Sequence, residues 1–86
     1  MYSVYILKCN NGALYTGITN NLEKRLRDHS NGCGSKYVRS HLPFNLVYVA
    51  RKRTKSAALK RECVIKKMSR AEKMALIKQN KKKPTK

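Results

Sequence analysis

The turn sequence Asn10-Asn11-Gly12, set between two short apolar segments, constrains the fold more than any other feature of the chain. The flanking segments, Tyr2–Cys9 and Ala13–Ile18, are rich in Tyr, Val and Ile, which favour β-strands. A three-residue loop that ends in a left-handed glycine is a common hairpin connection. The sequence therefore predicts an antiparallel hairpin near the N-terminus.

The length of this loop decides which side chains share a face of the hairpin, because side chains alternate along a strand. A three-residue loop pairs Tyr5 with Gly17 and makes Tyr5 and Tyr15 diagonal neighbours on one face. A two-residue loop would place the two tyrosines on opposite faces. The glycine in the last loop position favours the first alternative, so we expect Tyr5 and Tyr15 to lie together.

The rest of the chain predicts one further strand and three helices. Asn20 with Glu23 and Ser69 with Glu72 have the spacing of a capping box, and Ser56 is a candidate N-cap. The order ββα-β-αα predicts an α+β fold with a small antiparallel sheet, in one domain over residues 1–80 with a disordered basic tail over residues 81–86. The predicted elements are a helix that ends near Ser30, a strand over Phe44–Arg51, a helix from Ser56 to about Met68, and a helix from Ser69 to about Asn80.

The net charge of the chain is +17, from 21 basic and four acidic residues, and fifteen of the basic residues follow residue 50. Repulsion among these positive charges opposes a compact fold unless a polyanion offsets it. Nucleic acid is the predicted partner, and DNA is favoured. An anionic membrane is the alternative, but a membrane-binding helix would carry Trp or Phe on its apolar face. The chain has no Trp, and its single Phe lies in a predicted strand.

The length of the chain and its cysteines further limit the kind of protein it can be. A length of 86 residues allows one domain, and we expect a monomer. No apolar run approaches the roughly 20 residues that span a bilayer. The three cysteines form no C-x-x-C pair, so we expect free thiols in a reducing cytoplasm rather than a disulfide framework or a zinc site.

Glu62 is the one acidic residue without an evident local role, because the other three fit helix caps or helical ion pairs. Its predicted helical neighbours include Ala58, Leu59 and Ile65. A carboxylate against an apolar surface is a candidate metal ligand. An ordinary ion pair with Lys66 is the alternative.

Arg25 and His29 share the apolar face of the first predicted helix. Arg25 is either a solvated side chain with a packed stem or a group that emerges at the edge of the core. His29 is either a packed, hydrogen-bonded residue or a site residue. The same alternatives hold for Tyr5 and Tyr15, which are core aromatics or hydroxyl donors at a site.

Taken together, these residues resemble the GIY-YIG nuclease domain, over about residues 2 to 68. The pattern consists of Val4-Tyr5, then Tyr15-Thr16-Gly17, then Arg25 and His29 on a helix, then Glu62 on a later helix. Its most specific part is the run from Tyr15 to Arg25. The whole is similar to the small, single-domain bacterial branch of that superfamily. The resemblance implies a three-stranded antiparallel sheet flanked by helices, and phosphodiester hydrolysis with one divalent metal, Mg²⁺ or Mn²⁺.

The resemblance also implies roles for individual residues. Tyr5 would help to generate the attacking hydroxide, Glu62 would hold the metal near the leaving oxygen, and Arg25 would balance charge on the phosphate. Tyr15 and His29 would complete the hydrogen-bonded site. A free tyrosine has a pKa of about 10, and a nearby arginine and metal ion favour its phenolate. Gly17, opposite Tyr5, would leave room for a phosphate to approach.

The sequence departs from the family pattern at three points. Ser3-Val4-Tyr5 stands for Gly-Ile-Tyr, and Thr16 replaces the central Ile of the second motif. Many active members carry an Asn roughly a dozen residues after the metal-binding Glu, where this chain has Met74–Ile77, and the next Asn is Asn80. No DNA-recognition domain fits the length.

These departures predict weak, sequence-tolerant cleavage of DNA, or cleavage that needs a protein partner for specificity. The alternative is a non-catalytic module that binds DNA or RNA on the same scaffold. We expect backbone contacts from a set of basic residues that follow the first helix, end the third strand or lie near Glu62. They are Lys36, Arg39, Arg51, Lys52, Arg53 and Lys66.

Overall fold

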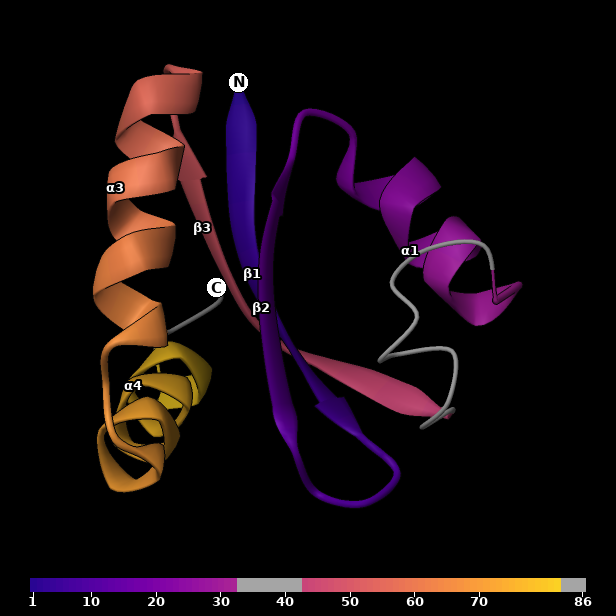
Figure 1. Cartoon of the computed structure of the whole chain (residues 1–86), viewed down its shortest axis with the longest axis vertical. Helices are drawn as coiled ribbons and strands as arrows, with labels where there is room; N and C mark the ends of the chain where they lie inside the picture. The colour runs from indigo at the N-terminus through magenta and orange to yellow at the C-terminus, as the bar shows by residue number, and fades with distance from the viewer. Residues whose placement is uncertain (33–42, 83–86) are drawn as a thin grey trace.

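The computed structural model describes residues 1–32 and 43–82, with side chains up to residue 79. Within these residues the chain forms a three-stranded antiparallel sheet and three helices (Figure 1). The predicted α+β class and the order ββα-β-αα are confirmed. No helix in this part of the chain is long and apolar enough to cross a membrane. The elements are β1 (Tyr2–Cys9), β2 (Leu14–Thr19), α1 (Leu22–Ser30), β3 (Phe44–Lys52), α3 (Lys55–Lys66) and α4 (Arg70–Lys82).

The β1–β2 hairpin has the predicted three-residue loop. The Cys9 amide donates a hydrogen bond to the Ala13 carbonyl at 2.8 Å, and the Gly12 amide donates to the Cys9 carbonyl at 2.8 Å. Gly12 has a φ of 85°, the left-handed conformation that glycine adopts without steric cost. Tyr5 is therefore paired with Gly17, as the loop length predicts.

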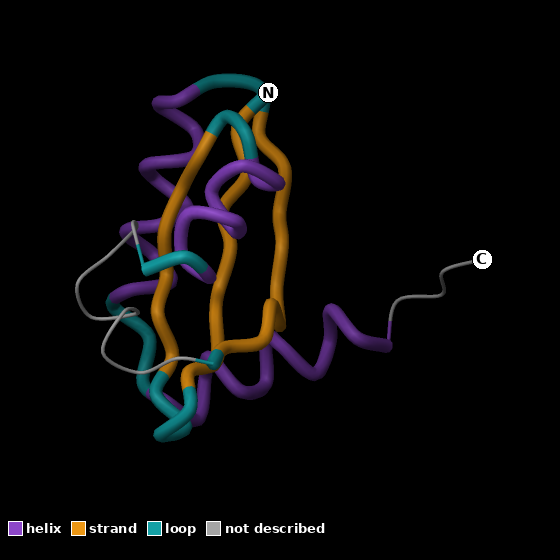
Figure 2. The backbone as a smooth tube through the Cα atoms, turned by 90° about the vertical axis from the view of Figure 1, so that its right-hand side faces the viewer, coloured by secondary structure: helices purple, strands orange, loops and turns teal. Residues whose placement is uncertain are grey.

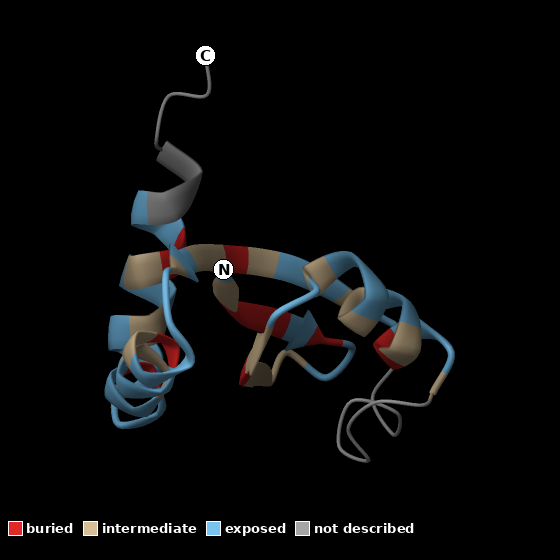
Figure 3. Cartoon of the chain, turned by 90° about the horizontal axis from the view of Figure 1, so that it is seen from above, coloured by how far each residue is buried: buried red, intermediate tan, exposed pale blue. Residues whose placement is uncertain are grey.

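The sheet has the strand order β2-β1-β3, so β1 is the central strand and both of its faces are covered. Val4 and Ile6 face α3 and α4, whereas Tyr5 and Leu7 face α1. Figure 1 shows α3 and α4 on one side of the sheet and α1 on the other. In Figure 3 the buried residues lie along the sheet and on the helix faces turned toward it. Burial on both faces explains why β1 has an almost continuous apolar sequence.

Two predicted helix caps are wrong by one or two residues. Asn21 rather than Asn20 caps α1, because its side-chain oxygen accepts a hydrogen bond at 3.1 Å from the amide three residues later. Thr54 rather than Ser56 caps α3 through the same type of bond at 3.1 Å. Thr54 has the extended backbone that an N-cap requires, with φ −126° and ψ 158°.

The predicted capping box at the start of α4 is confirmed. The Glu72 amide donates to the Ser69 hydroxyl at 3.2 Å, and the Ser69 amide donates to the Glu72 carboxylate at 2.8 Å. The helix continues to Lys82, so the predicted basic tail begins two residues too early. Figure 2 shows the end of α4 projecting beyond the sheet.

The Thr16 hydroxyl on β2 is buried and has no hydrogen-bond partner among the described residues, with 5% of the residue exposed. Thr16→Val removes this unsatisfied group, so we expect the free energy of unfolding in urea to rise by roughly 1 kcal/mol. Thr19→Val is the matched control, because the Thr19 hydroxyl accepts from the Asn21 amide at 3.1 Å and this change should destabilise the protein. A Thr16→Val protein less stable than the wild type would contradict the assignment.

Candidate active site

The Tyr5 ring packs directly over Gly17 on the neighbouring strand. Tyr5 is 1% exposed, and a Cβ atom added at Gly17 would lie 2.7 Å from the Tyr5 hydroxyl oxygen and 2.8 Å from the ring carbon Cζ. Glycine is therefore required here for the tyrosine to lie across β2. The space above Gly17 is filled by the Tyr5 ring. The approach of a phosphate to Gly17 stays a prediction.

The Tyr5 hydroxyl and His29 Nε2 are 3.0 Å apart and form a buried hydrogen bond. Tyr15 lies beside both groups, with its ring centroid 6.5 Å from that of Tyr5 and 5.7 Å from that of His29. The expectation that Tyr5 and Tyr15 share a face is confirmed. β1, β2 and α1 thus each contribute one member of a packed aromatic cluster.

Phe44 completes this cluster, although the sequence did not mark it as a site residue. Its ring meets His29 edge to face, with centroids 6.0 Å apart and an interplanar angle of 82°. Phe44 is the first residue of β3 and pairs with Cys9 on β1. The sequence signal that could have revealed it was its place as the only phenylalanine, at the start of the third strand.

His29 is held in its neutral form. Burial lowers its pKa from the ordinary value of 6.5, the Arg25 guanidinium lowers it further, and the Asp28 carboxylate opposes the shift. A neutral imidazole has one ring nitrogen free to accept a proton. With hydrogen on Nδ1, His29 Nε2 accepts the hydrogen bond that the Tyr5 hydroxyl donates.

Tyr5 is held as the protonated phenol, and a phenolate favoured by an arginine together with a metal ion stays a prediction. Burial is the largest cause that raises its pKa to about 12, and the neighbouring Tyr15 raises it as well. The Arg25 guanidinium lowers this pKa, and the Glu62 carboxylate raises it. Desolvation therefore outweighs the arginine. The same interactions show that Arg25 and Glu62 lie within electrostatic reach of the Tyr5 hydroxyl.

Glu62 reaches this site from the opposite layer. It lies on α3 within one turn of Ala58 and Ile65, which are fully buried against the sheet. The Glu62 carboxylate nevertheless raises the pKa of Tyr5, so its charge acts on the hydroxyl on the other face of the sheet. Glu62 Oε2 is also 3.3 Å from Lys66 Nζ, so the ion pair considered from the sequence is present as well.

A divalent cation at Glu62 would find one protein carboxylate. Within residues 1–32 and 43–82, no three His, Cys, Asp or Glu side chains converge as a metal-binding group. This arrangement fits Mg²⁺, which commonly binds through one or two carboxylates and keeps several waters or substrate oxygens. Glu62 is the residue that would hold it, since its charge acts on Tyr5.

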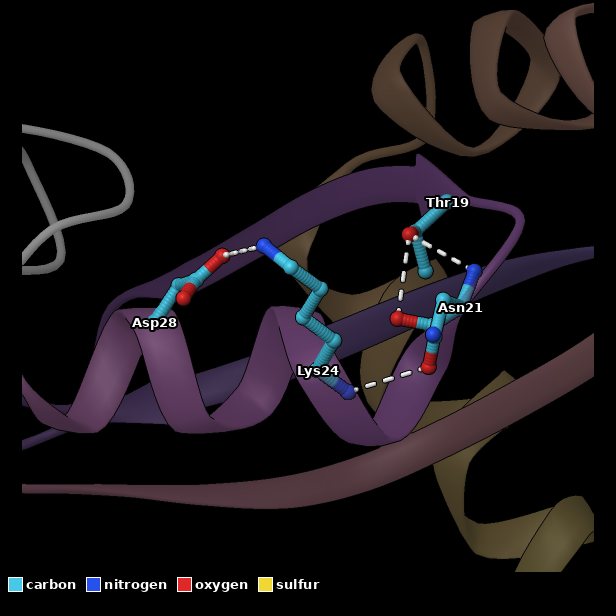
Figure 4. Close-up of polar contacts among 4 residues, drawn as sticks. All are labelled: Thr19, Asn21, Lys24 and Asp28. Carbon is cyan, nitrogen blue, oxygen red and sulfur yellow. Dashed lines mark hydrogen bonds and ion pairs between the residues drawn. The ribbon is translucent and has the colours of Figure 1, made fainter.

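A solvent-accessible cleft lies beside Arg25. It has a volume of about 340 Å³ and is lined by Arg25, by the end of β2 and by the first turns of α1. Figure 4 shows two of the contacts that shape it, the Asn21 cap and the Lys24–Asp28 ion pair at 3.2 Å. Arg25 is half-buried, so its stem can pack at the edge of the core while its guanidinium faces this cleft.

Three of the basic residues predicted to bind nucleic acid lie together at one end of the sheet. Arg51 on β3 and Thr19 on β2 both pair with Ser3 on the central strand. The end of β3 and the part of the cleft at Thr19 therefore lie at the same end of the sheet. Lys52 and Arg53 follow Arg51 along the chain. Of the other three, Lys66 lies next to Glu62, whereas Lys36 and Arg39 lie outside the described residues.

Comparison with known proteins agrees with this fold. Residues 1–75 match the GIY-YIG catalytic domain. A UPF0213 protein of Syntrophus aciditrophicus is 55% identical over 78 residues, which are 90% of this chain and 90% of that protein. A UPF0213 protein of Clostridium perfringens is 53% identical over 77 residues, which are 90% of this chain and 83% of that protein.

Two solution NMR structures have the same fold. The structure of a UPF0213 protein from Bacillus halodurans has a TM-score of 0.61 at 38% identity, and the match covers 92% of this chain and 85% of that one. A protein from E. faecalis has a TM-score of 0.66 at 31% identity, with coverage of 99% and 91%. The chain has the α+β fold of the GIY-YIG nuclease superfamily. It belongs to the GIY-YIG family, as the sequence pattern predicted.

Gly17→Ala tests the packing of Tyr5 against β2. The added methyl must displace a buried ring, so we expect a loss of roughly 1 to 3 kcal/mol in the free energy of unfolding. The same change in a Tyr5→Leu background should cost much less, because the hydroxyl and ring carbon that it meets are gone. Equal costs in the two backgrounds, measured by urea denaturation, would contradict the contact.

His29 should make stability depend on acid. Because its folded pKa lies below 6.5, its contribution to stability is complete above about pH 6.5 and is lost as pH falls through the lowered value. The unfolding free energy of the wild type should therefore fall more steeply between pH 7 and about pH 5 than that of His29→Gln. Parallel pH profiles of the two proteins would contradict the neutral assignment.

Proposed function

We propose that this protein is a divalent-cation-dependent endonuclease that hydrolyses DNA phosphodiesters. One observation carries the proposal. The buried Tyr5 hydroxyl is hydrogen-bonded to a neutral histidine, while an arginine and a carboxylate both act on its pKa. A core tyrosine needs one hydrogen-bond partner but has no need of two opposite charges beside it. Perturbed titratable groups clustered in this way are typical of catalytic sites.

The chain's own residues can perform the proton transfer of hydrolysis. As a water molecule attacks phosphorus, its proton passes to the Tyr5 oxygen while the Tyr5 proton passes to His29 Nε2. The new oxygen–phosphorus bond replaces the bond to the leaving oxygen of the sugar. The Arg25 guanidinium balances the charge that grows on the phosphoryl oxygens.

Glu62 is the residue proposed to hold the divalent cation. When bound, such an ion stabilises negative charge on the phosphate and the leaving oxygen as a Lewis acid. The resemblance to GIY-YIG nucleases, which generally use a divalent metal, supports this assignment. A single carboxylate does not distinguish Mg²⁺ from Mn²⁺.

DNA binding is assigned to the basic residues at the sheet end and on α3. Contacts from lysine and arginine to the backbone carry no sequence information, so we expect weak and sequence-tolerant cleavage, with any specificity supplied by a protein partner. At Met74–Ile77, where many family members carry a late Asn, the side chains are apolar. Ile77 is buried in the core at 6% exposure, and Asn80 lies beyond the last described side chain.

Nicking of supercoiled plasmid at low salt tests the proposal. We expect nicking with Mg²⁺ or Mn²⁺ and none with chelator. Tyr5→Phe and Glu62→Gln should each lower the rate by about 100-fold or more, since they remove the proton relay and the cation ligand. Tyr2→Phe and Glu23→Gln are the matched controls, one on β1 and one on the exposed side of α1, and should nick like the wild type.

The alternative is a nucleic-acid-binding module without cleavage, and one observation favours it. Tyr5 is a protonated phenol and the Glu62 carboxylate is paired with Lys66, so neither of these two oxygens is an unpaired base. This alternative predicts salt-sensitive binding of plasmid, branched DNA and RNA with no cutting of any of them. Binding with no metal-dependent cleavage would therefore overturn the nuclease proposal.

A further inference from the structure

The two partners of the Glu62–Lys66 ion pair differ in how far they are exposed to solvent. Lys66 Nζ lies 3.3 Å from Glu62 Oε2, yet the glutamate side chain is 17% exposed and the lysine side chain is 57% exposed. The carboxylate is thus fixed against the sheet, whereas the ammonium extends into solvent on a flexible stem. Glu62 is therefore held in one place, whereas the Lys66 ammonium can move away from it.

A carboxylate in this position needs a positive counter-charge, because burial makes an uncompensated charge costly. Lys66 supplies that charge at a contact distance of 3.3 Å. A divalent cation would supply twice the charge, at about 2.1 Å from a carboxylate oxygen. The cation and the ammonium compete for the same oxygens and repel each other, so the stronger ligand excludes the weaker one.

We propose that Lys66 is a built-in counterion of Glu62, which the divalent cation displaces, and that the displaced ammonium then binds a phosphate of the nucleic acid. The inference rests on the proposed function. It adds that cation binding and nucleic-acid binding reinforce each other through one lysine side chain. By thermodynamic linkage, each ligand raises the affinity for the other by the same factor.

Lys67 provides a matched control for this inference. It is exposed and adjacent to Lys66, but it lies about 100° further around the helix and so points away from the Glu62 side. Lys66→Ala and Lys67→Ala remove the same charge from neighbouring positions. Any difference between them reports the ion pair rather than the net charge of the chain.

Calorimetric titration with MnCl₂, without nucleic acid, tests the competition directly. We expect Lys66→Ala to bind Mn²⁺ about fivefold more tightly than the wild type, which corresponds to the upper range for an exposed ion pair. Lys67→Ala should stay within about twofold. Lys66→Arg keeps the pair and should resemble the wild type, and Glu62→Gln should lose the binding.

Fluorescence anisotropy with a labelled DNA duplex tests the second step. In a Tyr5→Phe background, which prevents cleavage, Lys66→Ala should lower affinity for the duplex more in Mn²⁺ than in chelator. The reason is that the lysine is free for phosphate only after the cation has displaced it. An equal loss under both conditions would overturn the release of Lys66.

The failure of this inference can be separated from that of the proposed function. If the wild type nicks plasmid but Lys66→Ala and Lys67→Ala bind Mn²⁺ equally, Lys66 is no counterion and the nuclease proposal stands. If neither the wild type nor Lys66→Ala binds Mn²⁺, and no plasmid is nicked, both proposals are wrong. Unfolding free energies measured in chelator confirm that each variant is folded.

Discussion

The packing of the Tyr5 ring across Gly17 is the constraint on which the site depends. It requires the three-residue hairpin loop, because a one-residue change in register would remove Gly17 from its place opposite Tyr5 and put Tyr15 on the other face of the sheet. It also requires glycine on β2, since any Cβ would lie 2.7 Å from the hydroxyl. With both conditions met, the hydroxyl lies next to His29, and the Glu62 charge acts on its pKa.

The site thereby draws on both layers of a very small protein. The α1 layer contributes Arg25 and His29 from one helix face, and the α3 layer contributes Glu62 with its lysine partner. Between them, β1 and β2 hold two tyrosines with their rings in contact. At rest the proton-transfer groups are neutral, and the carboxylate is compensated by Lys66.

Much of the fold could be predicted from the sequence because local chemistry determines it. The position of Gly12 fixed the hairpin loop and hence the shared face of Tyr5 and Tyr15, and the Ser69–Glu72 spacing identified one helix start. Where two adjacent residues could cap, as at Asn20 and Asn21, the backbone conformation decides, and the sequence does not show it. The raised pKa of Tyr5 was missed for a related reason, because desolvation depends on tertiary burial.

Paramagnetic broadening by Mn²⁺ tests the central claim most directly, namely that Glu62 marks a cation site beside Tyr5 and His29. In ¹H–¹⁵N and aromatic NMR spectra of the uniformly labelled protein, low concentrations of Mn²⁺ should selectively broaden signals around Glu62, Tyr5, Gly17 and His29. The four acidic residues of the chain make the result easy to assign. Broadening centred instead on Glu23, Asp28 or Glu72, or none at Glu62, would contradict the account.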